Sequence, residues 1–425
     1  MKKVSLHEVT SKIGSGATPR GGKNAYQGGE YSLIRSMNVF DDFFNRFELA
    51  KINEDQATKL NNVAVQEGDV LINITGASVA RVNIVPKDIL PARVNQHVSI
   101  IRPIREKLYN NFLHYYLVQP VVKQKLLAIA LGSSREAITK DSLENFQINL
   151  PNLKNQVKIA DILSILDKKI QLNDEINSEL KKIAQKIYDY WFIGFNFPNV
   201  EGHPYYVNDG EMIYSKELKR DIPANWDVKK LRDIASVVTG KTPSTKNIKN
   251  YSVKDYMFIG PEELTNNPLC IEKSAKYISQ YGFDSIKSNT ISGESILVSS
   301  IGVIGRIGFT NHIVATNQQI NSLTNFVSSN LSYYVYFYLK SISQSLHNLA
   351  GNTVIPIMAK STFEQIKIII PDDKTLTSFT NQVQPLFKKI QKNSQESVEL
   401  AKLRDWLLPM LMNGQVTVLN SNNTL

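Results

Sequence analysis

The chain repeats itself with a period of about half its length, and this repeat constrains the fold more than any other feature. Short phrases of the first half recur in the second half, in the same order and at a nearly constant offset. The pairs are GSGATPRGGKNAY (from Gly14) and VTGKTPSTKN (from Val238), GDVLINITGASVAR (68–81) and GESILVSSIGVIGR (293–306), Asn95-Gln96 and Asn317-Gln318, NNFLHYYL (110–117) and YYVYFYL (333–339), KDSLENFQINLP (140–151) and KSTFEQIKIIIP (360–371), and DKKIQLN (167–173) and FKKIQKN (387–393). One chain of 425 residues therefore contains two similar units.

Each half starts with short strand-like runs and ends in a long helix-like segment. The runs are rich in β-branched residues and flanked by Gly or Pro, and Pro151 and Pro371 close the last run of each half. The segment GFNFPNVEGHPYYVNDG between the halves is typical of a connector. We predict an α+β chain with mixed α/β domains at 1–151 and 226–371, long helices at 152–195 and 372–416, a linker at 196–225 and a tail at 417–425.

Both helix-like segments carry apolar residues in the alternating 4-then-3 spacing of a coiled-coil seam. The seam residues are Ile159, Leu163, Leu166, Ile170, Leu180, Ile187 and Trp191 in the first segment, and Phe379, Val383, Leu386, Ile390, Leu400, Leu407 and Leu411 in the second. Polar residues interrupt the first seam at Asn173 and Asn177, and they interrupt the second at the matching places of the repeat, Asn393 and Ser397. Matched length and pattern predict that the two helices pack on each other.

An antiparallel pair of such helices, each roughly 55 Å long, would act as a spacer between two globular domains related by an approximate two-fold axis. The alternative is that each helix packs on its own domain or on another chain. Pro409 stands where the first copy has Asp189, and a proline breaks helical hydrogen bonding, so we expect the second helix to end or kink there.

The charge balance favours a polyanionic partner, with nucleic acid first. The net charge is +10, and both halves share the excess: residues 1–150 hold 19 Lys and Arg against 14 Asp and Glu, and residues 216–371 hold 17 against 11. A proteome rich in Lys and Asn would also yield a basic protein. There is no apolar run of membrane-spanning length, and the only cysteine is Cys270, which excludes an internal disulfide. We expect an intracellular, cytoplasmic protein.

The whole chain resembles the specificity subunit of a type I restriction-modification enzyme. The resemblance rests on the repeat, on the Thr-Pro phrases near Thr18 and Thr242, on the linker FNFPNVEGHPYY…ELKRDIPANWDVKKLRDIA, and on the paired segments LSILDKKIQLNDEINSELKKIAQKIYDYWF and LFKKIQKNSQESVELAKLRDWLLPMLMNGQV. It implies that each domain is a target recognition domain and that the helices dock two adenine-methyltransferase subunits. It also implies that the chain itself catalyses nothing: the methyltransferase subunits bring S-adenosylmethionine, ATP and Mg are expected in partner subunits, and a translocating restriction subunit can join.

Two like domains with different residues should read two different half-sites of double-stranded DNA, which gives a split, non-palindromic target. The candidate DNA-binding residues are Thr18, Arg20, Arg81, Asn95, Gln96, Lys241, Thr242, Lys246, Lys249, Arg306, Asn317 and Gln318. Asn and Gln can contact adenine and Arg can contact guanine or phosphate. Because the Asn-Gln pairs recur in domains that should read different sequences, a framework role fits them better, and an ion pair is the alternative for each arginine. Solvated loop lysines are the alternative for Lys241, Lys246 and Lys249.

The candidate residues of the helix-pair and subunit interface are Ile159, Leu163, Leu166, Ile170, Asn173, Leu180, Leu386, Ile390, Asn393, Leu400 and Leu407. The two competing functions are a stand-alone DNA-modifying enzyme and a coiled-coil protein scaffold. The sequence TGKTPS is not a phosphate-binding loop because Ala235 stands where that motif needs glycine. Six histidines show no metal-ligand spacing, and no methyltransferase cofactor loop is found, so we expect neither a metal site nor catalysis.

Overall fold

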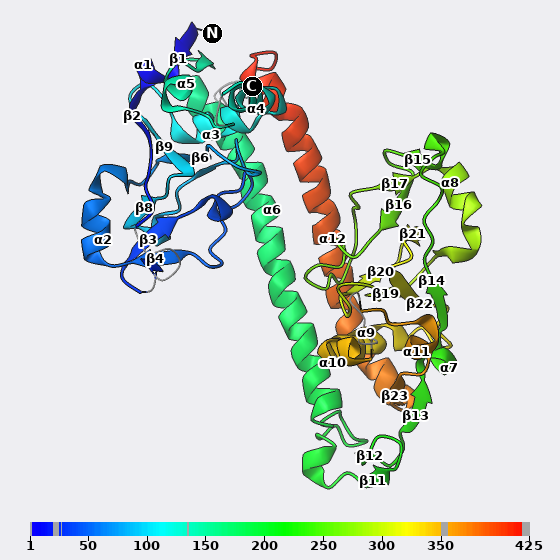
Figure 1. Ribbon diagram of the computed structural model, residues 1–425. Helices are drawn as coiled ribbons and strands as arrows, with labels where there is room; N and C mark the ends of the chain where they lie inside the picture. The colour runs from blue at the N-terminus through cyan, green and yellow to red at the C-terminus, as the bar shows by residue number, and fades with distance from the viewer. Residues whose placement is uncertain (1, 20–24, 27, 134–135, 350–355, 419–425) are drawn as a thin grey trace, which may run out of the picture. The chain divides into compact units, whose positions relative to one another are not determined.

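The computed structural model describes residues 2–19, 25–26, 28–133, 136–349 and 356–418. The chain divides into two compact units, of which unit 1 comprises Met1–Lys169 with Leu400–Leu425, and unit 2 comprises Ile170–Glu399. Each unit contains one β-rich domain and a stretch of both long helices (Figure 1). Among the described residues, no helix is long and apolar enough to cross a membrane.

The described residues of domain 1 (2–150) form a two-stranded sheet and two four-stranded sheets, with orders β1-β10, β2-β9-β6-β7 and β4-β3-β8-β5. The strands are β1 (Lys2–Ser5), β2 (Thr10–Ser15), β3 (Tyr31–Ile34), β4 (Ala50–Ile52), β5 (Ala64–Val65), β6 (Val70–Asn73), β7 (Val82–Ile84), β8 (Ala92–Val94), β9 (Val98–Pro103) and β10 (Gln147–Leu150). The helices are α1 (Leu6–Val9), α2 (Glu54–Lys59), α3 (Asn110–Val118), α4 (Pro120–Leu131) and α5 (Lys140–Glu144).

Domain 2, residues 227–370, has the sheet orders β13-β23, β14-β22-β19-β20 and β15-β17-β16-β21-β18. Its strands are β13 (Asp227–Lys230), β14 (Ser236–Thr239), β15 (Tyr251–Ser252), β16 (Tyr256–Ile259), β17 (Tyr277–Ile278), β18 (Thr290–Ile291), β19 (Ser295–Ser299), β20 (Ile307–Thr310), β21 (Val314–Thr316), β22 (Ile320–Thr324) and β23 (Lys367–Ile370). Its helices are α7 (Leu231–Ile234), α8 (Gln280–Ser285), α9 (Leu331–Ser341), α10 (Ser343–Asn348) and α11 (Lys360–Glu364). A hairpin of β11 (Met212–Ser215) and β12 (Arg220–Pro223) lies in the connector.

The repeat in the sequence is a repeat in topology. In each domain the first strand pairs antiparallel with the last, Lys2 opposite Leu150 in one and Asp227 opposite Ile370 in the other. The four-stranded order β2-β9-β6-β7 matches β14-β22-β19-β20, and β4-β3-β8-β5 matches β17-β16-β21-β18. The pairs β3–β8 and β16–β21 are both parallel, whereas the other pairs are antiparallel. The predicted α+β class, with two like domains and two long helices, is confirmed.

The long helices are α6 (Leu153–Tyr188), which continues into a π-helical turn at Asp189–Ile193, and α12 (Asp373–Met412). In unit 2 they run antiparallel, because Asn173 of α6 bonds Ser397 while Asn177 bonds Ser394. The predicted antiparallel pairing is therefore confirmed.

Of the two outcomes expected at Pro409, an end of α12 is wrong, since the helix continues to Met412, and a kink stays a prediction. Pro409 and Asp405, the residue whose carbonyl lacks a partner, are both exposed, so water can replace the missing bond. The helix end follows instead from Gly414, whose φ of +71° is the left-handed conformation that terminates helices.

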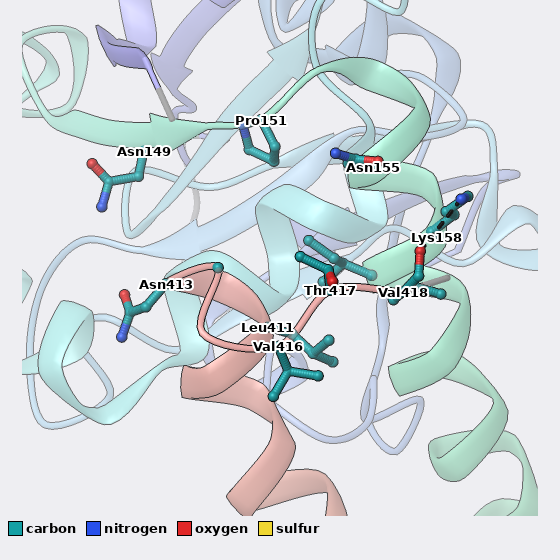
Figure 2. Close-up of a pocket in the computed structure, with 11 residues that line it drawn as sticks. Asn149, Pro151, Asn155, Lys158, Leu411, Asn413, Val416, Thr417 and Val418 are labelled. Carbon is teal, nitrogen blue, oxygen red and sulfur yellow. Dashed lines mark hydrogen bonds between the residues drawn. The ribbon is translucent and has the colours of Figure 1, made fainter. Parts of the chain in front are cut away.

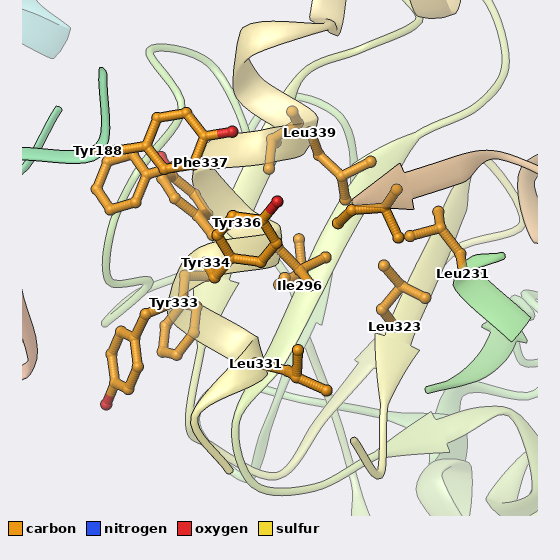
Figure 3. Close-up of a cluster of buried hydrophobic side chains, with 14 of the residues drawn as sticks. Tyr188, Leu231, Ile296, Leu323, Leu331, Tyr333, Tyr334, Tyr336, Phe337 and Leu339 are labelled. Atoms are coloured by element: carbon orange, nitrogen blue, oxygen red, sulfur yellow. The ribbon is translucent and has the colours of Figure 1, made fainter. Parts of the chain in front are cut away.

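The largest apolar cluster of unit 2 lies between α9, the sheet β14-β22-β19-β20 and the two long helices. Figure 3 shows the aromatic residues of α9 and Tyr188 of α6 on one side of this cluster, and the aliphatic residues Ile296 and Leu323 of the sheet on the other. In unit 1 the equivalent cluster joins α3 and α4 to Ile159 and Leu163 of α6 and to Leu408 and Leu411 of α12. Each domain is therefore fused to both long helices through one continuous core.

Candidate nucleic-acid interface

Both domains contain the same side-chain hydrogen bond between their two repeated loops, which we call the Thr–Gln clamp. The Thr18 hydroxyl donates to Gln96 Oε1 in domain 1, and Thr242 donates to Gln318 Oε1 over 2.6 Å in domain 2. The Thr-Pro and Asn-Gln phrases, which are far apart in the sequence, thus meet on one edge of each domain. Gln96 and Gln318 are exposed, so this edge can face a ligand.

A glycine beside each Thr-Pro phrase allows the two loops to approach. A Cβ added to Gly16 would lie 1.7 Å from the Val94 carbonyl oxygen, and one added to Gly240 would lie 2.2 Å from Thr316 Oγ1. The Gly16 amide donates to the Asn95 carbonyl over 3.1 Å, and the Lys241 amide donates to the Thr316 carbonyl over 2.9 Å. Only glycine fits this backbone-to-backbone contact.

Replacing Gly16 with alanine is expected to destabilise domain 1 by about 1–3 kcal/mol, because the added methyl group forces the two loops apart. Gly14→Ala is the matched control, since a Cβ at Gly14 meets no atom within 4 Å. Denaturant unfolding followed by a probe in domain 1 measures the difference. Equal stability of the two variants would show that the loops separate without cost.

Each Asn of the Asn-Gln pairs uses its side-chain oxygen inside its own loop. Asn95 Oδ1 accepts from the His97 amide and Asn317 Oδ1 accepts from the Gln319 amide, each over 3.0 Å. Asn95 is also buried. These bonds are consistent with the framework role that was the alternative to base contact for Asn95 and Asn317. The adjacent glutamines are the exposed members of each pair.

Arg81 and Arg306 follow equivalent turns, and each contacts its own domain. The Arg81 guanidinium lies 4.4 Å from the centre of the Phe40 ring. Arg306 Nη1 donates to the Pro261 carbonyl and to Thr265 Oγ1, each over 3.0 Å. Neither arginine has a carboxylate partner among the described residues, so the ion pair considered from sequence is replaced by a cation–π contact and by neutral acceptors.

The remaining sequence candidates are cations near the Thr-Pro phrases. Lys241, Lys246 and Lys249 are exposed on the loop between β14 and β15. Arg20 lies outside the described residues. The described part of domain 2 gives the three lysines no ion-pair partner, so their charge is available to a polyanion.

The polar residues of the helix seams meet one another in unit 2. Asn173 Nδ2 lies 2.9 Å from Glu396 Oε2 and 3.3 Å from the Asn393 carbonyl, and Asn393 Nδ2 donates to Asn177 Oδ1 over 2.9 Å. All three asparagines are buried. Of the apolar interface candidates, Ile159, Leu163 and Ile390 are buried, whereas Leu166, Ile170, Leu180, Leu386, Leu400 and Leu407 are half-buried.

A charged cluster that the sequence pattern did not reveal joins domain 1 to both helices. Arg404 of α12 donates to Asp167 of α6 over 2.8 Å and to Asp42 of domain 1 over 3.3 Å. The Tyr115 hydroxyl of α3 donates to the other oxygen of Asp167 over 2.5 Å. Four segments that are remote in sequence meet here, so no local motif could have identified the cluster.

The ring of His114, beside Tyr115, has a buried Nδ1 atom without a hydrogen-bond partner in the described structure. Burial lowers the pKa of His114 from 6.5 to about 4. A neutral buried histidine stabilises the fold above pH 6.5, and this contribution is lost as the pH falls toward the folded-state pKa, because the unfolded chain takes up the proton first.

Between pH 8 and pH 5 the His114 contribution to the free energy of unfolding is expected to fall by about 2 kcal/mol. The variant His114→Phe, which cannot titrate, should reduce this pH dependence; Tyr336 holds the repeat-equivalent position of domain 2, so a ring fits there. Denaturant unfolding at several pH values measures the slope. His203→Phe, at an exposed residue of the connector, is the control, and an unchanged slope in His114→Phe would contradict the assignment.

A cluster of aromatic rings joins domain 2 to the helices. Tyr188 of α6 is 1% exposed, and its ring centre lies 5.5 Å from that of Phe337 and 6.4 Å from that of Phe379. Phe387 of α12 lies 4.8 Å from Tyr333 of α9. In the aligned repeat phrases, Phe387 and Phe337 hold the places that Asp167 and Tyr115 hold in the first half. Positions that are equivalent in the repeat therefore carry polar side chains in the first half and phenylalanines in the second.

A second apolar stripe on the helices remains exposed. In unit 2 it comprises Leu172, Ile183, Tyr190 and Ile193, with Ile176 half-buried between them, and in unit 1 it comprises Leu403 and Trp406 of α12. The residues of α6 and of the π-helical turn that follows it recur at intervals that place them on one face. Exposed stripes of this kind, especially with Trp and Tyr, mark protein–protein contact sites.

The cavities lined by described residues show no metal centre. Figure 2 shows one of about 530 Å³ in unit 1, where the segment after α12 passes Asn149, Pro151, Asn155 and Lys158. Its mixed lining of amides and aliphatic groups holds no acid–base or nucleophile pair. No cluster of three or more His, Cys, Asp or Glu able to hold a metal ion occurs among the described residues.

Comparison with known proteins gives one family. The model of the type I restriction modification DNA specificity domain matches residues 1–182 and 223–400. The HindI specificity subunit of Haemophilus influenzae is 27% identical over 98% of this chain and 99% of its own length. The MjaIX specificity subunit of Methanocaldococcus jannaschii is 26% identical over 96% of this chain and 91% of its own.

A solved structure shares the fold. The type I restriction-modification S subunit from M. genitalium matches with a TM-score of 0.58 at 14% sequence identity, over 96% of this chain and 95% of that one. The family match covers both domains and most of both long helices. The chain therefore belongs to the type I restriction-modification specificity family, as a non-catalytic DNA specificity subunit with two recognition domains.

Proposed function

We propose that domain 1 and domain 2 read two different half-sites of one asymmetric, interrupted DNA target. The observation that carries this proposal is the Thr–Gln clamp, which is the same in both domains while the surrounding side chains differ. A shared framework positions each domain on the duplex, and unlike residues beside it select unlike bases. In this proposal Gln96 and Gln318 with Lys241, Lys246 and Lys249 lie against the DNA, and the lysines neutralise phosphates.

The exposed apolar stripe is the proposed docking site for two adenine-methyltransferase subunits. Tyr190 in unit 2 and Trp406 in unit 1 are large, exposed and amphipathic, as the residues that dominate binding at interfaces usually are. The partner subunits would supply S-adenosylmethionine, and restriction subunits would supply ATP and Mg chemistry. The assembly would act in the cytoplasm, where it meets DNA.

Reconstitution with a methyltransferase encoded beside this chain, followed by methylation-site sequencing, tests the function. We expect one motif made of two unlike half-sites, and no DNA modification by the chain alone. Tyr190→Ala and Trp406→Ala should weaken subunit assembly, measured by analytical ultracentrifugation, whereas Tyr281→Ala, at an exposed tyrosine of α8, should not. A palindromic motif, or turnover by the isolated chain, would contradict the proposal.

A further inference from the structure

Residues that select bases should lie on secondary-structure elements that both domains contain, at positions where their side chains differ. One such region is the wall formed beside Arg81 in domain 1, and beside Arg306 in domain 2, by the loop after β3 or β16 and the helix after α3 or α9. Arg81 contacts Phe40 and Arg306 contacts Thr265, and Phe40 and Thr265 stand equally far before their arginines in the sequence. The loops after β3 and β16 are therefore equivalent at this point, and so are the helices that follow α3 and α9.

In domain 2 this wall surrounds an open cavity of about 440 Å³. Asn266 and Arg306 line one side, and Gln344, His347 and Asn348 of α10 line the other. Asn266, Gln344, His347 and Asn348 are exposed, and none of their side chains bonds a described residue. The cavity thus offers amide and imidazole donors and acceptors that the described fold does not use.

Other polar groups beside the cavity form hydrogen bonds within domain 2. Asn267 Oδ1 accepts from the Ile307 amide over 2.8 Å, and its carbonyl accepts from the Tyr336 hydroxyl over 2.8 Å. The bonds of Arg306 to Pro261 and Thr265 fix the loop after β16 on the same side. The unused side chains therefore project from a rigid support, which a reading surface requires.

In domain 1 an ion pair joins the corresponding loop and helix. The Val82 amide donates to Asp41 as the Ile307 amide donates to Asn267, so Asp41 is the equivalent of Asn267, the neighbour of Asn266. The Asp41 carboxylate forms an ion pair with Lys123 of α4. It also accepts from the Val82 amide over 2.9 Å. Equivalent elements thus present an internally neutralised pair in one domain, and in the other four polar side chains that no described residue engages.

The turn between β19 and β20 links the cavity to the edge that carries the Thr–Gln clamp. Its lining includes Ile304 and Gly305, from the turn that begins at Ser300. The Ser300 amide donates to the Gln319 carbonyl over 2.7 Å, and Gln319 follows Gln318 of the clamp. A duplex that contacts the clamp edge would therefore meet a turn that also lines this cavity.

We propose that Asn266, Gln344, His347 and Asn348 are specificity-determining residues that hydrogen-bond base edges in the major groove of the half-site read by domain 2. Amide side chains pair with the donor and acceptor of adenine, and an imidazole N–H can donate to N7 of either purine while the other ring nitrogen can accept from adenine N6. This inference rests on the proposed function of domain 2. Domain 1, where an ion pair between Asp41 and Lys123 joins the corresponding loop to α4, would read its half-site through different residues.

The test compares single variants in the reconstituted methyltransferase complex. Gln344→Ala, His347→Ala and Asn348→Ala remove side chains from α10, and Asn266→Gly keeps the left-handed backbone, for which φ is +68°. Methylation-site sequencing measures the preference at every position of both half-sites. At least one variant should lose about ten- to a hundredfold of discrimination at one base of one half-site, with the other half-site unchanged.

Gln365→Ala, at an exposed residue beyond α11, is the matched control and should leave both half-sites as they are. Unchanged preferences in all four cavity variants would overturn the inference while the proposed function stands. Weaker methylation of all sites with unaltered preference would also overturn it, because that result indicates phosphate contacts. Wild-type complex without sequence preference would instead refute the proposed function itself.

Discussion

Exchanging residues 227–370 for the matching segment of another specificity subunit is expected to replace one half-site completely and to leave the other unchanged. Asp227 and Ile370 are paired opposite each other in the β13–β23 sheet, so both cuts fall at one place in the structure. The remaining chain, with domain 1 and both long helices, keeps its own contacts. Methylation-site sequencing of the reconstituted complex reads the outcome directly.

The design must preserve the aromatic junction, because the transplanted domain has to fit the helices it receives. Tyr333, Tyr334 and Phe337 of α9 should be retained, since they contact Phe387, Phe192 and Tyr188. Exchange of residues 2–150, whose ends are likewise paired, is the reciprocal control and should alter only the other half-site. Loss of both half-sites in a complex that still assembles would show that the domains do not read independently.

Tyr188→Ala is expected to lower the free energy of unfolding of unit 2 by about 3–5 kcal/mol, as for other large-to-small changes of buried aromatic residues. The ring is 1% exposed and contacts rings from α9, α12 and the π-helical turn. Its removal leaves a cavity where domain 2 meets both helices. Denaturant unfolding with a probe in unit 2 measures the effect.

Tyr190→Ala is the matched control for stability, because Tyr190 is 50% exposed and lies close to Tyr188 in the sequence. It should change the unfolding free energy by less than about 0.5 kcal/mol while weakening methyltransferase assembly. Comparison of the two variants distinguishes a residue that stabilises unit 2 from one that is proposed to contact a partner subunit. Similar losses of stability in both variants would contradict the packing assigned to Tyr188.

The repeat made much of this fold predictable, because phrases that recur in order must occupy like positions in like domains. The antiparallel helix pair followed from matched seams with polar residues at matched places, and Asn173, Asn177 and Asn393 carry the bonds between them. The clamp between Thr18 and Gln96 was not foreseen as a contact, although both residues were singled out. Sequence spacing alone does not say which repeated phrases touch.

Other features depend on contacts between segments that no local pattern connects. The cluster of Arg404, Asp167 and Asp42 joins both helices to domain 1 from distant parts of the chain. Charged residues on a helix are usually predicted to face solvent, so their pattern did not predict this cluster. α12 does not end at Pro409, one of the two outcomes expected there, because Pro409 is exposed, where the cost of a missing bond is small. The DNA contacts of individual residues stay predictions, since the fold shows which side chains are free and not which bases they meet.

The buried amides of α6 and α12 in unit 2 have a further consequence for the register of the helix pair. Sliding one helix along the other by a turn would strand Asn173 and Asn393 against leucine and isoleucine, with donors and acceptors unsatisfied. One alignment is therefore strongly preferred over all the others. The helix pair of unit 2 therefore keeps its register even when the exposed residues along it change.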